Sequence, residues 1–135
     1  MIDAPKAIRD YIQTLTTVTA MVGTRVYPET DVLPAGKQPS DGRAICFQIR
    51  GGVMTNDDSI VLPSVQFTLW APASNGESAE YRCYELYRTF VDAMVGKGGA
   101  TARYAWLETL GQTLHHPDSG WPFVLCAFRM AVANS

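Results

Sequence analysis

The sequence contains one cluster of residue types that commonly bind metal ions, and it includes two adjacent histidines. His115 and His116 are followed by Pro117 and Asp118, and imidazole and carboxylate groups are common ligands of zinc. Adjacent side chains on an extended chain point to opposite faces, so both rings cannot easily reach one ion, and no third ligand stands at a recognisable spacing. We therefore expect a surface loop and no metal site. A small metal- or ligand-binding module that uses His115 and His116 stays an alternative.

The other reactive residue types form no catalytic motif. Cys46, Cys83 and Cys126 are far apart and lie among apolar neighbours, which predicts buried, inert thiols. Asp57 and Asp58 fall in a turn-forming segment, where acidic side chains commonly bond to the local backbone. The sequence contains no nucleophile elbow, no phosphate-binding glycine loop before a helix and no CxxC pair. It therefore predicts a protein that is not an enzyme and uses no cofactor.

Length and charge exclude further classes. The chain has 135 residues, with 11 Lys and Arg against 13 Asp and Glu, and this length predicts a single domain, 1–135. The nearly balanced charge offers no basic surface for nucleic acid. No apolar run reaches the roughly 18 residues that a membrane span needs. The N-terminus lacks a signal-peptide pattern, so we expect synthesis in a cytoplasm.

The spacing of apolar residues predicts two helices and several strands. Residues 4–15 and 78–95 have apolar side chains at helical spacing, with Asp3 as the N-cap of the first helix. Ser74 or Asn75 could begin the second helix earlier, because Glu77 follows Ser74 at the spacing of a capping box. Alternation and turn residues predict strands at 43–50, 64–70, 101–110 and 123–133, a brief strand at 25–28, a loop at 29–42, a long hairpin at 53–63 and a turn at 111–122.

The last strand constrains the architecture. Its residues are apolar on both faces, and only Arg129 interrupts one of them. Such a strand must be covered on both sides. The order helix, short strand, hairpin, helix and two strands predicts an α+β fold, in which a mostly antiparallel sheet of about four to five strands is packed on one face by two helices.

Apolar residues at strand ends and loop edges are candidates for contact with a partner protein, because aromatic side chains bring a large contact area at small entropic cost. The projecting hairpin and the loop at 29–42 are the segments that we expect to reach a neighbour. The predicted interface residues are Arg50, Met54, Asp57, Asp58, Ile60, Trp70, Trp106, Trp121, Phe128 and Met130.

Several short segments follow one another in a characteristic order along nearly the whole chain. They are MVGTRVYP at 21–28 after the first helix, RGG at 50–52, SVQFTLWA at 64–71, YEL at 84–86 and DSGWP at 118–122 before the final strand. In this order they resemble the tail terminator, or tail-completion, family of long-tailed phages, prophages and gene transfer agents.

The resemblance implies a structural role in a virion. A member of this family is a small α+β subunit that forms a ring, generally a hexamer, which caps the completed tail tube and docks to the head connector. The implied partners are further copies of the chain, the major tail tube protein and the head-closure or connector protein, with DNA only passing through the lumen. The family has no catalytic residues to transfer. Another neck component, such as a head-closure adaptor, is the alternative.

Overall fold

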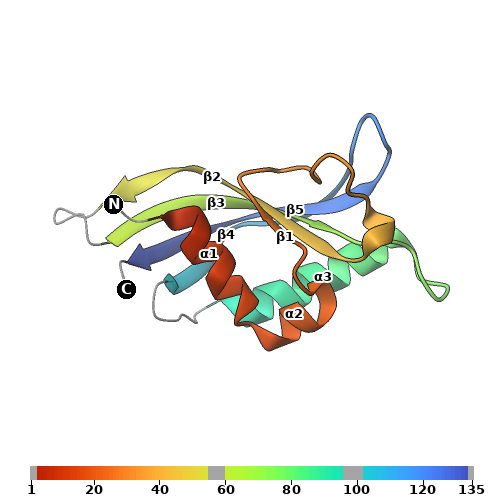
Figure 1. Cartoon of the computed structure of the whole chain (residues 1–135). Helices are drawn as coiled ribbons and strands as arrows, with labels where there is room; N and C mark the ends of the chain where they lie inside the picture. The colour runs from red at the N-terminus through yellow and green to blue at the C-terminus, as the bar shows by residue number, and fades with distance from the viewer. Residues whose placement is uncertain (1–2, 55–59, 96–101, 134–135) are drawn as a thin grey trace.

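The protein folds into a five-stranded sheet with helices on one face (Figure 1). The computed structural model describes residues 3–54, 60–95 and 102–133. The elements in chain order are α1 (Ala4–Gln13), α2 (Thr16–Val22), β1 (Val26–Pro28), a 3-10 turn (Pro39–Asp41), β2 (Ala44–Met54), β3 (Ile60–Trp70), α3 (Ala79–Met94), β4 (Ala102–His115) and β5 (Pro122–Ala133).

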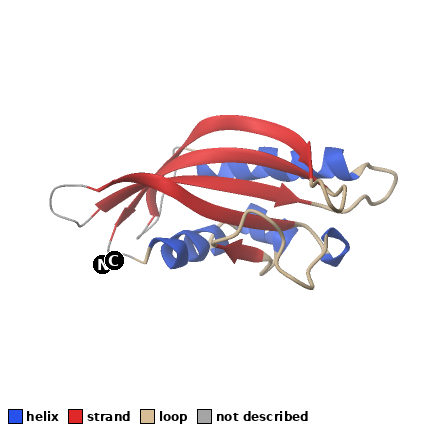
Figure 2. Ribbon diagram, turned by 90° about the horizontal axis from the view of Figure 1, so that it is seen from above, coloured by secondary structure: helices blue, strands red, loops and turns tan. Residues whose placement is uncertain are grey.

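The sheet has the strand order β1-β2-β3-β5-β4. Only the short β1 is parallel to its neighbour, and the other three pairings are antiparallel. Figure 2 shows the long strands curving together as one twisted sheet. The predicted α+β fold with a mostly antiparallel sheet is therefore confirmed.

The main core lies between the sheet and the three helices. Phe67 is at its centre, with ring centroids 4.8 Å from Phe90 of α3 and 5.6 Å from Phe128 of β5. Val65, Phe67 and Leu69 alternate along β3 and are fully buried, as the period-2 pattern predicts. One face of each strand therefore faces the helices.

The N-terminal segment forms two helices, α1 and α2, where the sequence predicts one helix at 4–15. Asp3 caps α1 as expected, since its carboxylate accepts a hydrogen bond of 3.1 Å from the Lys6 backbone N–H. The β-branched stretch that follows is the helix α2, in which Val18 and Val22 are buried against the core. Burial of these two side chains outweighs the low helix propensity of the stretch. None of the described helices is long and apolar enough to cross a membrane.

The turn predicted at 111–122 is wrong over about half its length. β4 continues to His115, and β5 already begins at Pro122, so only 116–121 connect them. Gln112 pairs with Leu125 and Leu114 with Phe123 across the ladder. The apolar strand β5 supplies backbone partners for a segment whose own composition indicates a turn, because strand formation depends more on the neighbour than on propensity.

Candidate interaction surface

One end of the sheet face away from the helices is covered by the loop at 29–42. Trp70 is 1% exposed there and stacks on Phe123, with ring centroids 4.6 Å apart. Its indole N–H donates to the Thr68 hydroxyl, which in turn donates to the backbone carbonyl of Asp31 in the loop. The interface prediction for Trp70 is therefore corrected: this side chain belongs to a second small core of the same chain.

Phe128 and Met130 also lie inside the chain. Both are fully buried in the main core, and the Phe128 ring is 5.5 Å from that of Phe90. They alternate on the face of β5 that packs against the helices, so no surface of either side chain is left for a neighbour. The sequence analysis predicts that this strand is covered on both sides but also names both residues as interface candidates, and the helices of the same chain cover this face.

The predicted hairpin is present as the ends of two paired strands. Met54 is the last residue of β2 and pairs with Val61, while Ile60 is half-buried at the start of β3. The Arg50 guanidinium is exposed, and it lies 2.7 Å from the Asp31 carboxylate. Arg50 therefore already holds the 29–42 loop to β2. Asp57 and Asp58 lie outside the described residues.

Trp106 remains a surface residue. It is 38% exposed, and its ring centroid is 5.5 Å from that of Tyr104, which is 47% exposed. Trp106 is directly opposite Arg129 in the β4–β5 ladder, and Arg129 is opposite Ser64 of β3. Residues that face one another across antiparallel strands share a face, so this aromatic pair lies on the sheet face away from the helices.

A charged network accompanies the aromatic pair. The Ser64 hydroxyl donates to the Glu108 carboxylate at 2.6 Å, and the Arg129 guanidinium donates to the same carboxylate at 3.0 Å. These hydrogen bonds, that of Ser64 first, hold the pKa of Glu108 below its ordinary value. Arg129 therefore presents no free positive charge, and this part of the sheet face is polar but neutralised.

The histidine segment is a tight turn. The His116 ring accepts hydrogen bonds from the backbone N–H groups of Asp118 and Ser119 at 3.3 and 3.4 Å, and the His116 N–H donates to the Trp121 carbonyl at 2.9 Å. Trp121 is half-buried against the small core around Trp70. His115 ends β4 opposite Pro122. The turn folds back on itself rather than directing both rings to one point.

The structure gives no geometry for metal or thiol chemistry in its described part. No group of three or more His, Cys, Asp and Glu residues there could hold a metal ion. Cys46, Cys83 and Cys126 are all buried, as expected, and burial raises their pKa to about 12, 11 and 12 respectively. A thiol with such a pKa is protonated at neutral pH and is a poor nucleophile.

Sequence reasoning missed several of the exposed apolar residues. Leu110 of β4 is 75% exposed, and Tyr81 and Tyr84 of α3 are 56% and 46% exposed. The two tyrosines lie outside the apolar stripe of α3. From this position the sequence could have predicted that they face outward. Leu110 gave no such signal, because it lies within the register shift between Thr109 and Gln112, which the sequence does not indicate.

No family model and no curated protein matches the chain. A chain in a solved structure described as "Virion of native gene transfer agent (GTA) particle" does match it, with a TM-score of 0.60 and 14% identity. The match covers 99% of this chain and 100% of that chain. The two chains share one fold.

Proposed function

We propose that this chain is a structural virion protein that forms a ring, caps the completed tail tube and joins it to the head connector. The observation that carries the proposal is the end-to-end match of its fold to a chain of a gene transfer agent virion. The ordered sequence segments at 21–28, 50–52, 64–71, 84–86 and 118–122 support the same role, since they resemble the tail terminator family. Six copies is the expected ring size.

The surface chemistry is consistent with assembly. Exposed aromatic side chains such as Tyr81, Tyr84 and Trp106 are typical of protein contacts, because they bury a large area with few rotatable bonds. In the proposed ring the chain contacts its own copies, the tail tube protein and the connector protein. A net charge of −2 fits a lumen through which DNA passes without being held.

The role can be tested with particles assembled without this chain. A cap stops the addition of subunits to the end of a tube, so its loss should leave tails of uncontrolled length and heads without tails in electron micrographs. Adding back the purified chain should restore a uniform length. Native mass spectrometry of the purified chain should find a ring. A chain that stays monomeric at every concentration and binds neither tubes nor connectors contradicts the proposal.

A different neck component, such as a head-closure adaptor, is the second candidate. The virion match favours it as well, because a fold shared with a virion chain is compatible with either position. The same particles distinguish the two. Tails of normal length beside unattached heads would indicate an adaptor, since the tube end would then be capped by another protein.

A further inference from the structure

Strand β2 has an open edge over much of its length. It spans Ala44–Met54, and β1 pairs with residues 45–47 only. Figure 1 shows β1 beside one end of β2. Within the part of the chain that the structure describes, no strand lies along residues 48–54 on the side opposite β3. An open strand edge presents backbone N–H and C=O groups with which another extended chain can pair.

The direction of the backbone groups shows which residue of this edge is free to pair. The Ile45 N–H donates to the Arg25 carbonyl at 3.0 Å, and the Phe47 carbonyl accepts from the Thr30 N–H at 3.0 Å. Both of these β2 residues therefore face β1. Backbone groups alternate in direction along a strand, so the N–H and C=O of Ile49 face the same side. β1 has ended at this point, and none of the described strands pairs with Ile49 there.

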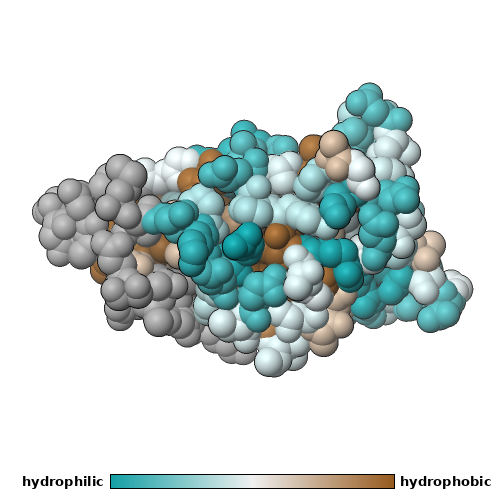
Figure 3. Space-filling view, in the orientation of Figure 1, coloured by the Kyte–Doolittle hydropathy of each residue, from teal (hydrophilic) through white to brown (hydrophobic). Residues whose placement is uncertain are grey.

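A hollow lies against the same part of β2, beside the first turn of α1. It has a volume of about 330 Å³ and is lined by Pro5, Glu29, Phe47, Gln48 and Ile49. Figure 3 shows hydrophobic side chains between hydrophilic ones beside β1. Glu29 has a φ of 60°, and at this left-handed residue the chain turns away instead of continuing β1 along β2. We call this space the hollow beside α1.

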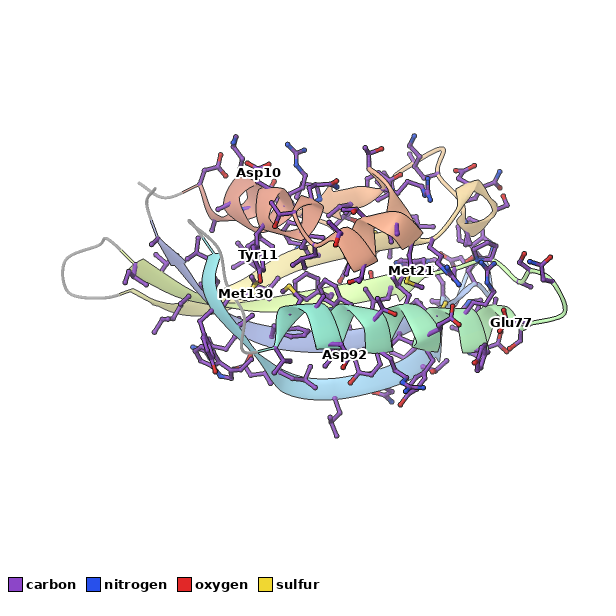
Figure 4. The ribbon with its side chains drawn as sticks, turned by 90° about the horizontal axis from the view of Figure 1, so that it is seen from below. Asp10, Tyr11, Met21, Glu77, Asp92 and Met130 are labelled. Carbon is purple, nitrogen blue, oxygen red and sulfur yellow. The ribbon has the colours of Figure 1, made fainter. Side chains whose placement is uncertain are left out.

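Helix α1 is a fixed wall of the hollow. Ile8 and Ile12 are fully buried in the main core, and Figure 4 shows Tyr11 pointing inward and Asp10 outward. Figure 4 also shows α1 along one side of the molecule and β4 along the opposite side. Pro5, in the first turn of α1, has no backbone N–H to donate to the edge of β2. The helix therefore bounds the space without satisfying the backbone groups beside it.

We infer that the hollow beside α1 binds an extended segment of another virion protein, which adds a short strand to β2 at Ile49. Main-chain hydrogen bonds to the N–H and C=O of Ile49 hold the segment, as in other cases of strand addition. The register shift between Ile49 and Gly52 interrupts the edge and keeps the added strand short. The inference rests on the proposed virion role and names the surface through which the chain holds a neighbouring component.

The surroundings of Ile49 define the chemistry of the segment. Residues directly opposite each other in neighbouring strands share a face, and Ile49 packs against the main core, so its opposite residue should be apolar. Among the described lining residues Glu29 alone is charged; it is exposed, and none of the ion pairs between described residues includes it. A basic residue in the segment is therefore favoured over an acidic one.

Strand β4 of a second copy fits this edge less well. Three register shifts against β5 interrupt the regular spacing of its backbone groups. Helix α3 also packs against β4, since the Tyr87 hydroxyl accepts a hydrogen bond of 2.8 Å from the Gly111 N–H. A strand that carries a helix on one face cannot enter a hollow that α1 already bounds on that face. The donor is therefore a segment of a different protein.

Hydrogen exchange of single amides tests the pairing. The purified chain and the assembled particles are exposed to D₂O, the particles are then dissociated, and NMR reads each amide of the chain. Exchange of the Ile49 N–H should be about tenfold or more slower in particles than in the purified chain, because the segment then accepts its hydrogen bond. The Gln48 N–H is the internal control: it faces β3, where Gln48 is opposite Gln66, and should exchange slowly in both samples.

Two variants of one residue separate the N–H from the side chain. Ile49→Pro removes the N–H, whereas Ile49→Ala removes apolar side-chain atoms and keeps it. The two purified variants should have similar unfolding midpoints, because an open edge tolerates proline. The proline variant should lower the yield of joined particles in electron micrographs about tenfold or more, and the alanine variant less than about threefold.

The outcomes separate this inference from the proposed function. Slow exchange of the Ile49 N–H in particles, with a larger loss of joining for proline than for alanine, supports strand addition. Fast exchange in joined particles, or equal joining by the two variants, overturns it and leaves the capping role intact. Slow exchange already in rings of the purified chain also overturns it, because a second copy then supplies the strand. Particles that assemble normally without this chain overturn both.

Discussion

Gly111 lies directly under the ring of Tyr87, where α3 approaches β4. A methyl group at this position would be 2.6 Å from Cζ of the tyrosine, and its backbone N–H donates to the hydroxyl of the same residue. The close approach of helix and strand at this point therefore requires a residue without a side chain.

Gly111→Ala should lower the free energy of unfolding by about 1–3 kcal/mol, because the Tyr87 ring must move out of its packed position. Chemical denaturation of the purified chain measures the change. Gln112→Ala is the matched control, since its side chain is exposed in the same strand, and it should change stability by about 0.5 kcal/mol or less. Equal stability of Gly111→Ala and wild type would show that the ring is free to move.

Trp70 and Trp106 show what the sequence cannot decide at this scale. Both lie in predicted strands with an apolar residue on either side in the sequence, and either could be core or interface. The loop at 29–42 folds over Trp70, while nothing among the described residues folds over Trp106 to the same extent. Burial depends here on a segment almost 40 residues away in the sequence, and local periodicity carries no information about it.

At the scale of elements, helix α3 begins where its own cap allows. The Ser78 hydroxyl accepts a hydrogen bond of 3.1 Å from the Tyr81 N–H and so satisfies one backbone donor of the first turn. Ser74 instead exchanges backbone hydrogen bonds with Glu77 in the preceding turn. The helix predicted at 78–95 is confirmed within one residue at each end, and the earlier start at Ser74 is wrong.

Ser78→Ala should lower the free energy of unfolding by about 1 kcal/mol through loss of this cap. Ser78→Asp should retain it, because a carboxylate accepts the same hydrogen bond and also favours a helix N-terminus. Ser74→Ala is the control and should be nearly neutral. Thermal or chemical unfolding measures all three. A larger loss at Ser74 than at Ser78 would place the functional cap earlier in the chain.

Helices and apolar strands of this chain could be predicted from periodicity, whereas the second half of β4 could not. Residues 111–115 contain a glycine and polar side chains and read as a turn. They form a strand because the ladder with β5 supplies their backbone partners, as in the pairing of Gln112 with Leu125. The hollow beside α1 could not be predicted from the sequence either, since its lining residues Pro5, Glu29 and Phe47 meet only in the folded chain.

Across the whole molecule, the three thiols report on global folding. Cys83 and Cys126 lie in the main core, and Cys46 lies in the small core on the other sheet face. Burial raises each pKa from 9.0 to about 11 or 12. The folded chain therefore keeps its thiols protonated at pH values at which the unfolded chain releases the protons.

Stability should consequently fall at alkaline pH. A raised pKa in the folded state contributes stability that is complete below pH 9 and is lost as the pH rises through 11 to 12. Urea unfolding in the presence of a reductant at pH 7, 9 and 10 measures the loss. Cys126→Ala should flatten the dependence, because one of the three groups is gone. An unchanged slope in this variant would assign the loss to other groups, such as Tyr11, whose pKa is also raised by burial.

The three register shifts of β4 against β5 are bulges, and they also affect whether the free subunit aggregates. A regular exposed edge of 14 residues would be a template for pairing with the edges of other chains, and such pairing leads to fibres and precipitates. The bulges prevent that growth. In the capping role that we propose, the subunit must wait until a tube reaches full length. A free subunit without a regular edge can accumulate in a crowded cell without aggregating, so that the tube, and not the concentration of the subunit, sets the time of assembly.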